Sequence, residues 1–145
     1  MDTILVAVDF SSVTEAVIDA AVGVSRAFDS SVYLLHVEPP EPDFVGYEAG
    51  PETVRETIAG KIRQEHRMLQ ELEGAPWHDR NKVSALLIQG PTVEKILQEQ
   101  ERLNADLIVM GSHGHGALYS LLVGSVAEGV LRRADCPILV VPSRR

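Results

Sequence analysis

The sequence contains a single cysteine among its 145 residues, and several other features are missing from it. One thiol cannot form an intrachain disulfide, which excludes a disulfide-stapled fold and favours a reducing compartment. No apolar run approaches the ~20 residues that a membrane-spanning helix needs. The chain opens directly into an apolar segment, without a basic region or a cleavage-site pattern, so we expect no signal peptide. We therefore expect a cytoplasmic protein with no membrane partner.

Positive charge is also scarce. The chain has 13 Lys and Arg residues against 21 Asp and Glu, a net charge of −8, and its basic pairs are Arg132-Arg133 and Arg144-Arg145. A chain with this balance is a poor candidate for binding nucleic acid, so we expect no nucleic-acid partner. It also follows that a bound phosphate must depend on local backbone dipoles, because the overall field of the protein opposes it.

What the sequence does contain is a regular alternation of two apolar patterns, with hydrophobic residues making up 45% of the chain. Short apolar runs predict five strands: Thr3–Val8, Val32–Val37, Val83–Ile88, Asp106–Met110 and Cys136–Pro142. Segments with helical spacing lie between them, beginning at a Ser12-x-x-Glu15 capping box, at Pro51, at Thr92 and near Tyr119, where the last helix is expected to run to Ala134. This order predicts one α/β domain over residues 1–145, with a parallel sheet covered by helices on both faces.

A Rossmann-like sheet with strand order 3-2-1-4-5 is the arrangement we expect. In such sheets ligands bind beyond the carboxyl ends of the strands, at the point where the winding reverses. With the first strand central and the fourth beside it, Asp9 and the loop at 111–125 border one crevice. The fifth strand is then an edge strand, and its uncharged run Ile138–Val141 needs a cover. We therefore expect a homodimer that pairs through residues 137–142.

The loop after the fourth strand carries the most specific pattern in the chain, Gly111-x2-Gly114-x9-Gly124-Ser125. Glycine permits a positive φ and lets backbone N–H groups approach a ligand with no Cβ in the way. Gly124 and Ser125 lie near the start of a helical segment, where unpaired N–H groups favour an anion. The pattern predicts phosphate binding, and the alternative is a plain connection between a strand and a helix.

Four other features need interpretation. Asp9 is either a binding residue or a turn residue in front of the first helix. His113 and His115 have the chemistry of metal ligands but lack a third ligand nearby. His36, at a strand end, is expected to be a hydrogen-bonded structural residue. The Pro- and Gly-rich segment 38–50 either covers a ligand or only connects two elements.

These residues resemble the universal stress protein family, and in particular its nucleotide-binding members, which share the glycine pattern. The resemblance covers nearly the whole chain and rests on five segments: Ile4–Ser11, Leu35–Val37, Asp106–Gly114, Gly124–Glu128 and Cys136–Val141. It implies an ATP- or AMP-type ligand, a homodimer and a role in regulation or stress response.

The resemblance also implies where the ligand lies. It assigns the phosphates to Gly111, Gly114, Gly124, Ser125 and the amide of Val126. It assigns the adenine and ribose to Ala7, Val8, the backbone of Val37 and Met110. Asp9 would lie near the ribose or hold Mg²⁺ bridged to the phosphates. His113, inside the glycine pattern, belongs to the same set of binding residues.

One departure from the family pattern affects affinity. Relatives often have Lys or Arg just after the second glycine, whereas this chain has His115 and no Lys or Arg between Arg102 and Arg132. A neutral imidazole supplies at most one donor and no charge. We therefore expect modest phosphate affinity that depends on Mg²⁺.

The function that these observations favour is nucleotide binding without catalysis. The stretch 107–125 contains no Glu, Lys or paired carboxylate to serve as a general base. One alternative is an enzyme of the adenine-nucleotide hydrolase type, and another is a stress-family interaction module with weak nucleotide binding. A phosphoacceptor receiver domain is disfavoured, because the third strand ends at Gln89-Gly90 rather than at an acceptor Asp.

Overall fold

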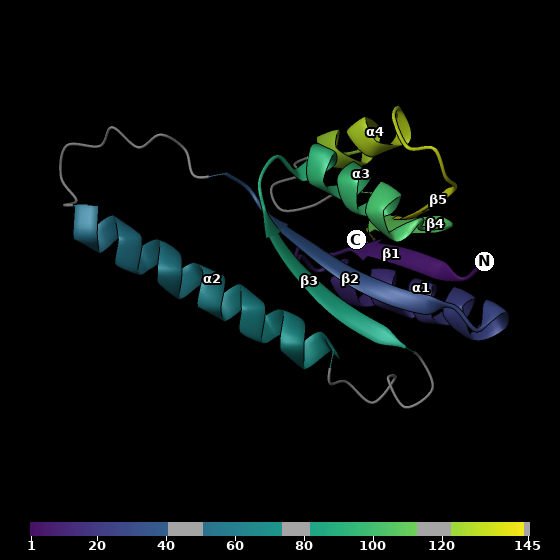
Figure 1. The fold of residues 1–145 in the computed structure, drawn as a ribbon, viewed down its shortest axis with the longest axis horizontal. Coiled ribbons are helices and arrows are strands. Elements are labelled where there is room, and N and C mark those ends of the chain that lie inside the picture. The colour runs from purple at the N-terminus through teal and green to yellow at the C-terminus, as the bar shows by residue number, and fades with distance from the viewer. Residues whose placement is uncertain (41–50, 74–81, 113–122, 144–145) are drawn as a thin grey trace.

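The structure is a computed structural model that describes residues 1–40, 51–73, 82–112 and 123–143. Its elements are β1 (Thr3–Ala7), α1 (Thr14–Phe28), β2 (Ser31–Glu38), α2 (Pro51–Glu73), β3 (Val83–Gln89), α3 (Thr92–Leu103), β4 (Leu107–Gly111), α4 (Ser125–Leu131) and β5 (Ile138–Val141). The strands form one parallel sheet in the order β3-β2-β1-β4-β5 (Figure 1). The expected strand order is confirmed.

Helices cover both faces of the sheet, as expected. Side chains alternate along a strand, so β1 contributes to two separate cores. Ile4 and Val6 pack with residues of α1 and with Leu69 of α2. Leu5 packs on the other face with Ile96 of α3 and with residues of α4. Figure 1 shows α3 and α4 together on one side of the sheet and α1 on the other.

β1 is the central strand, and this position creates the crevice. Ala7 lies opposite Leu35 of β2 on one side and opposite Met110 of β4 on the other. The chain winds outward from β1 to β3 in one direction and from β4 to β5 in the other. The carboxyl ends of β1 and β4 therefore border the point where the winding reverses, which is where ligands bind in this class of sheet.

Two helix boundaries differ from the prediction. The predicted capping box at Ser12 does not form. α1 begins at Thr14, and its N-cap residue is Val13, which makes no side-chain capping hydrogen bond. In the described part of the chain the last helix begins at Ser125 and ends at Leu131, short of Ala134. The predicted start near Tyr119 lies outside the described residues. The apolar pattern extends beyond the end of the helix because a hydrogen-bonded turn follows it. In this turn the amide of Ala134 donates to the carbonyl of Val130 at 2.9 Å.

Candidate functional site

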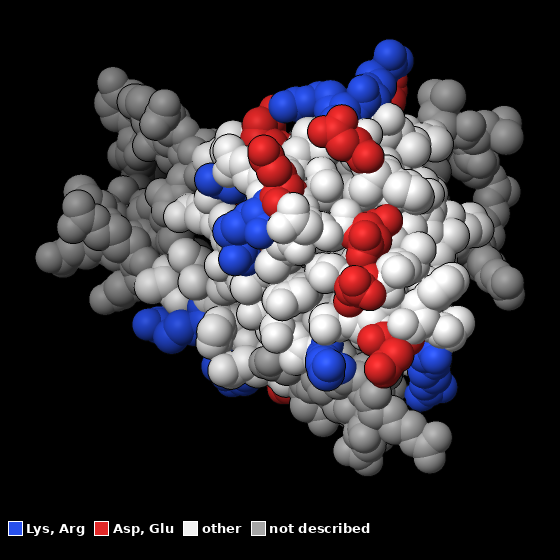
Figure 2. Space-filling view, turned by 45° about the vertical axis from the view of Figure 1, so that its right-hand side comes forward, with Lys and Arg blue, Asp and Glu red and all other residues white. Residues whose placement is uncertain are grey.

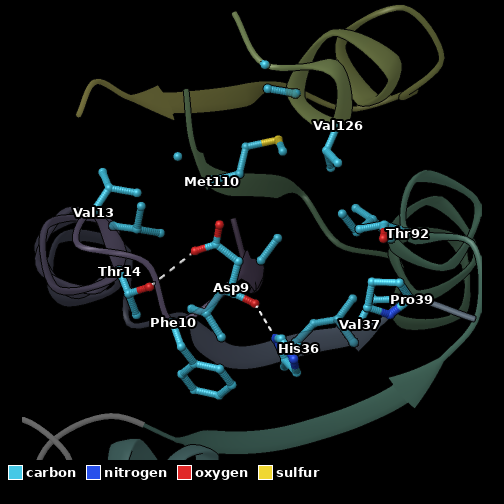
Figure 3. Close-up of a pocket in the computed structure, with 18 of the residues that line it drawn as sticks. Asp9, Phe10, Val13, Thr14, His36, Val37, Pro39, Thr92, Met110 and Val126 are labelled. Carbon is cyan, nitrogen blue, oxygen red and sulfur yellow. Dashed lines mark hydrogen bonds between the residues drawn. The ribbon is translucent and has the colours of Figure 1, made fainter. Parts of the chain in front are cut away.

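A cavity of about 740 Å³ opens beyond the carboxyl ends of β1, β2 and β4 (Figure 3). This volume falls within the roughly 300–1,000 Å³ that small-molecule sites occupy. Its walls come from the turn after β1, the ends of β2 and β4, the middle of α2 and the starts of α3 and α4. Segments far apart in sequence meet here because all the strands point the same way.

The structure brings together nine of the eleven binding residues that the sequence indicates. The nine that line the cavity are Ala7, Val8, Asp9, Val37, Met110, Gly111, Gly124, Ser125 and Val126. The other two, His113 and Gly114, lie outside the described residues, as do His115 and residues 41–50 of the expected loop. The cavity therefore contains both ends of the glycine pattern and the Asp9 turn.

Asp9 holds the turn between β1 and α1. Its Oδ1 atom accepts a hydrogen bond from the amide of Ser11 at 3.0 Å and a longer one from the Thr14 hydroxyl at 3.5 Å. Phe10, the residue between them, has a φ of 58°, a conformation that few residues other than glycine adopt. The turn interpretation of Asp9 is thus confirmed. Figure 3 nevertheless shows its carboxylate among the cavity residues, so the two roles are compatible.

Backbone hydrogen bonds link the two ends of the glycine pattern to each other and to β5. The amide of Gly124 donates to the carbonyl of Ser112 at 2.7 Å, and the amide of Ser112 donates to the carbonyl of Val141 at 2.8 Å. Gly124 has φ −62° and ψ 159°, and among the described residues the glycine with a left-handed φ is Gly90. The prediction that Gly111 and Gly124 are glycines because they need a positive φ is therefore wrong. The second reason, close approach of the backbone to a ligand, remains a prediction.

The floor of the cavity is apolar. Ala7, Val37, Met110 and Val126 line it and pack against the core on the α3 and α4 side of the sheet. β1 pairs with β2 only as far as Leu35, while β2 itself continues to Glu38. The last residues of β2 thus extend past the end of β1 along the cavity.

Sequence reasoning missed several residues that line the cavity. Thr92, at the start of α3, follows the Gly90 turn, and a strand–turn–helix pattern could have indicated it. Four further residues come from α2: Lys61, Gln64, Glu65 and Met68. Their spacing places them on one face of a helix. No signal in the sequence says which turn of a 23-residue helix lies beside β2.

A cluster of titratable side chains forms the wall between β2 and α2, and we call it the His36 cluster: His36, Glu38, Lys61 and Glu65. The Lys61 side chain is exposed, and the other three are largely buried. Nδ1 of His36 lies 2.8 Å from the Val8 carbonyl oxygen, which confirms the expected structural hydrogen bond. The Phe10 ring packs against the imidazole with centroids 4.5 Å apart. Nζ of Lys61 lies 2.6 Å from Oε1 of Glu38 and 3.7 Å from Oε1 of Glu65.

Burial and these contacts shift the ionisation of the cluster. Burial raises the pKa of the Glu65 carboxyl, and the adjacent Glu38 carboxyl raises it further. Burial also acts to raise the pKa of Glu38, but contacts with Glu65 and Lys61 outweigh it and lower that pKa overall. The hydrogen bond to Glu38 raises the pKa of Lys61. Among the described residues that line the cavity, Lys61 is the only Lys or Arg, and it is already paired.

The described surface agrees with the sparse positive charge of the sequence. In the view of Figure 2, acidic and basic side chains are interspersed, and the basic ones form no continuous area. No helix within the described ranges combines the length and apolar character needed to cross a bilayer.

Comparison with known proteins places this geometry in a family. The model of the universal stress protein family matches residues 1–142. The chain belongs to the universal stress protein family. A universal stress protein of Thermus aquaticus, encoded in the 3′ region of QAH/OAS sulfhydrylase, is 36% identical over 141 residues, covering 96% of this chain and 97% of that protein. The universal stress protein MJ0531 of Methanocaldococcus jannaschii is 33% identical over 95% of this chain and 80% of its own length.

Solved structures of universal stress proteins share the fold. The structure of MJ0577 of Methanocaldococcus jannaschii has a TM-score of 0.79 at 28% identity, covering 99% of this chain and 97% of that one. A universal stress protein in complex with cAMP has a TM-score of 0.70 at 21% identity, covering 97% and 96% of the two chains. Membership of this family associates the chain with the stress response.

Proposed function

We propose that this universal stress protein binds an adenine nucleotide, ATP or AMP, in the cavity at the carboxyl ends of β1, β2 and β4. The observation that supports it most directly is the convergence of nine predicted binding residues from separate segments on one cavity of suitable volume. The shared fold with a universal stress protein solved in complex with cAMP makes adenine nucleotides the first ligands to test.

The adenine fits the apolar part of the cavity. Ala7 and Val8 offer apolar surface to a base, and the backbone of Val37 lies where β2 extends past β1. Backbone donors and acceptors at that edge can recognise the polar edge of adenine, and burial of a flat ring between apolar side chains supplies affinity. We assign Met110 to the ribose side of the same slot, with Asp9 either beside the ribose or bound to Mg²⁺.

The phosphates then extend toward the glycine pattern. Gly111, Gly124 and Ser125 are small residues on the cavity wall, which lets the chain approach a phosphate closely. The Gly124 amide itself is bonded to Ser112, so we assign Gly124 a role in close approach rather than as a donor. Gly114 and His113 complete this part of the proposed site from outside the described residues.

Mg²⁺ belongs to the proposal for ATP. The one described basic residue on the cavity wall, Lys61, is paired with Glu38, so a triphosphate needs another source of positive charge. Asp9 is a carboxylate within the cavity, and Mg²⁺ is commonly held by one or two carboxylates together with phosphate oxygens. We assign Asp9 as the protein ligand of that ion.

We further propose that the nucleotide acts as a regulatory ligand and that the protein works as a homodimer. β5 is an edge strand of the sheet, and Leu139 on it is exposed. An uncharged edge strand that is left unpaired invites association, and a two-fold copy can cover it strand to strand. Nucleotide occupancy then changes the stability of the folded dimer by mass action.

The test is to denature the purified protein and identify by mass spectrometry what it releases. We expect a stoichiometric adenine nucleotide, or saturable binding of ATP or AMP to stripped protein with GTP as the control. Absence of any adenine nucleotide binding would reject the proposal. Steady release of ADP and phosphate from added ATP would instead support the alternative enzyme of the adenine-nucleotide hydrolase type.

A further inference from the structure

The His36 cluster presents three buried acceptor atoms to one another. Nε2 of His36 lies 3.4 Å from Oε2 of Glu65 and 3.6 Å from Oε2 of Glu38. The His36 side chain is only 7% exposed, and the two carboxylates are 12% and 13% exposed. None of these three atoms has a hydrogen-bond partner among the described residues. Buried polar atoms without partners are costly, so an arrangement of three calls for an explanation.

The hydrogen bond to Val8 fixes the chemistry of the imidazole. A carbonyl oxygen can only accept, so Nδ1 of His36, 2.8 Å away, carries the proton. In the neutral ring Nε2 then has a lone pair, which faces two carboxylate oxygens. Three lone pairs directed at one point repel each other unless a cation lies between them. A histidine whose Nδ1–H is held by a backbone carbonyl is also the usual arrangement of a metal ligand.

The distances fit a tetrahedral ion. Zn–N and Zn–O bonds of about 2.0–2.1 Å at tetrahedral angles separate the ligand atoms by about 3.3 Å. The separations of 3.4 and 3.6 Å from Nε2 are close to that value, and all three atoms lie within 4.8 Å of one another. One imidazole and two carboxylates suit a transition-metal ion better than Mg²⁺, which prefers oxygen ligands and octahedral geometry.

We propose that Nε2 of His36, Oε2 of Glu38 and Oε2 of Glu65 form a binding site for one divalent transition-metal ion, with Zn²⁺ as the probe. Lys61 contacts the other oxygen of each carboxylate, which turns the two Oε2 atoms toward His36. His36 and Glu65 line the cavity, so a fourth ligand can reach the ion from that side. The proposal does not rest on nucleotide binding, and it uses different residues from the Mg²⁺ proposed at Asp9.

A proton is the competing occupant of the same position. An imidazolium, or a proton shared by the two carboxyls, would also relieve the repulsion between the three lone pairs. Zn²⁺ would displace such protons, so its binding should release protons into the buffer. If the site accepts a metal ion, added Zn²⁺ binds and protons are released. If the site accepts only a proton, added Zn²⁺ does not bind stoichiometrically.

The experiment is calorimetric titration of nucleotide-free protein with Zn²⁺ in two buffers of different ionisation enthalpy. We expect one ion per chain, proton release, and a rise in Tm with Zn²⁺. Glu38→Gln and Glu65→Gln keep the shape of the side chains but remove a charged ligand, and each should weaken binding by at least about 10-fold. Co²⁺ in place of Zn²⁺ should give the intense visible absorption of a tetrahedral site.

Matched controls separate this site from incidental binding. Lys61→Met keeps all three ligands but removes the cation that orients the two carboxylates, so it should weaken Zn²⁺ binding by less than either glutamine variant does. His66→Ala removes an exposed histidine next to Glu65 and should leave binding unchanged. The Tm of each glutamine variant without metal shows that it is folded. The proposal would be overturned if the parent bound no stoichiometric Zn²⁺, or if both glutamine variants bound Zn²⁺ as tightly as the parent.

Discussion

The amide of Gly124 lies 2.7 Å from the carbonyl oxygen of Ser112, and this hydrogen bond holds together the two ends of the glycine pattern. The bond is made by backbone atoms, and the backbone of Gly124 has extended dihedrals that any residue can adopt. The backbone conformation therefore does not require glycine at this position. In the proposed site, glycine leaves space beside the cavity for the phosphates.

Gly124→Thr is expected to separate folding from binding. Threonine favours extended dihedrals and is about as good as glycine at the N-cap position that Gly124 holds in α4, so the Tm should stay close to that of the parent. A branched side chain on the cavity wall should weaken adenine nucleotide binding by at least about 10-fold, since each 1.4 kcal/mol lost is a factor of ten. Titration of parent and variant with ATP and AMP measures the effect. Unchanged affinity would remove Gly124 from the proposed site.

Asp9→Asn should remove the effect of Mg²⁺ while keeping the turn. The amide oxygen of asparagine can still accept from the Ser11 amide, so the fold should be retained. The parent should bind ATP more tightly with Mg²⁺ than with EDTA, and the variant should bind with the lower affinity in both. Parallel calorimetric titrations test this. Equal affinity of the parent in both conditions would contradict the Mg²⁺ assignment.

Gly129→Ala in α4 is expected to destabilise the protein, although alanine is the better helix former. A Cβ at Gly129 would lie 2.8 Å from Cγ2 of Val93, a stiff β-branched side chain on α3. Overpacking costs about 1–3 kcal/mol, against a gain of about 1 kcal/mol in helix propensity, so we expect a net loss of about 1 kcal/mol.

Gly23→Ala in α1 is the matched control for that substitution. Nothing lies within 4 Å of a Cβ at Gly23, so the propensity gain is unopposed. We expect stabilisation of about 0.5–1 kcal/mol. Urea unfolding of the two variants should thus give changes of opposite sign. If Gly129→Ala also stabilised the protein, α3 and α4 would not be packed as closely as the structure shows.

Asp106→Asn should change how stability depends on pH. The Asp106 carboxylate accepts hydrogen bonds from the amides of Thr3 and Asp2 at 3.0 and 2.7 Å, and these bonds lower its pKa below the ordinary value of 3.8. A lowered folded pKa gives stability that is complete above 3.8 and is lost as the pH falls through the folded value. The Tm advantage of the parent over the variant should therefore be largest near neutral pH.

Measurements of Tm from pH 7 down to pH 2 test this sign. The advantage of the parent should shrink only below about pH 4, where carboxylates begin to protonate. A constant difference across the whole range would show that the charge of Asp106 contributes nothing beyond the hydrogen bonds that asparagine can also accept.

Leu139→Lys should prevent the proposed homodimer. Leu139 is the exposed hydrophobic residue on the edge strand β5, and a lysine on an edge strand discourages pairing. Light scattering after size exclusion should give a parent mass near twice the 15.8 kDa chain and a variant mass near one chain. A parent that elutes as a monomer would reject pairing through residues 137–142.

The order of the strands could be predicted from the sequence because the signals are local and repeated. Apolar runs such as Ile4–Val8, bounded by turn residues, indicate buried parallel strands, and the segments between them have the length and spacing of crossover helices. Handedness and winding rules then leave few topologies. Asp9, Val37 and Gly111 could be placed at one crevice because the carboxyl ends of parallel strands lie at the same edge.

Helix ends were less predictable, since several residues compete for the same cap. Ser12 and Glu15 have the spacing of a capping box, yet Asp9 accepts from the Ser11 amide and α1 starts at Thr14. At α4, the apolar spacing runs through a turn that is no longer part of the helix, so the pattern alone overestimates its length. The spacing of residues along the chain does not show which of the competing hydrogen bonds forms at a helix end.

Patterns between near neighbours in the chain are enough to predict the sheet, its strand order and the strand ends that border the cavity. Only the tertiary structure placed Lys61 and Glu65 of α2 beside His36 and Glu38 of β2, and only it showed that Gly129 leaves room for Val93. These contacts join residues tens of positions apart. Their geometry depends on how a helix packs on the sheet, which the spacing of residues along the chain does not specify.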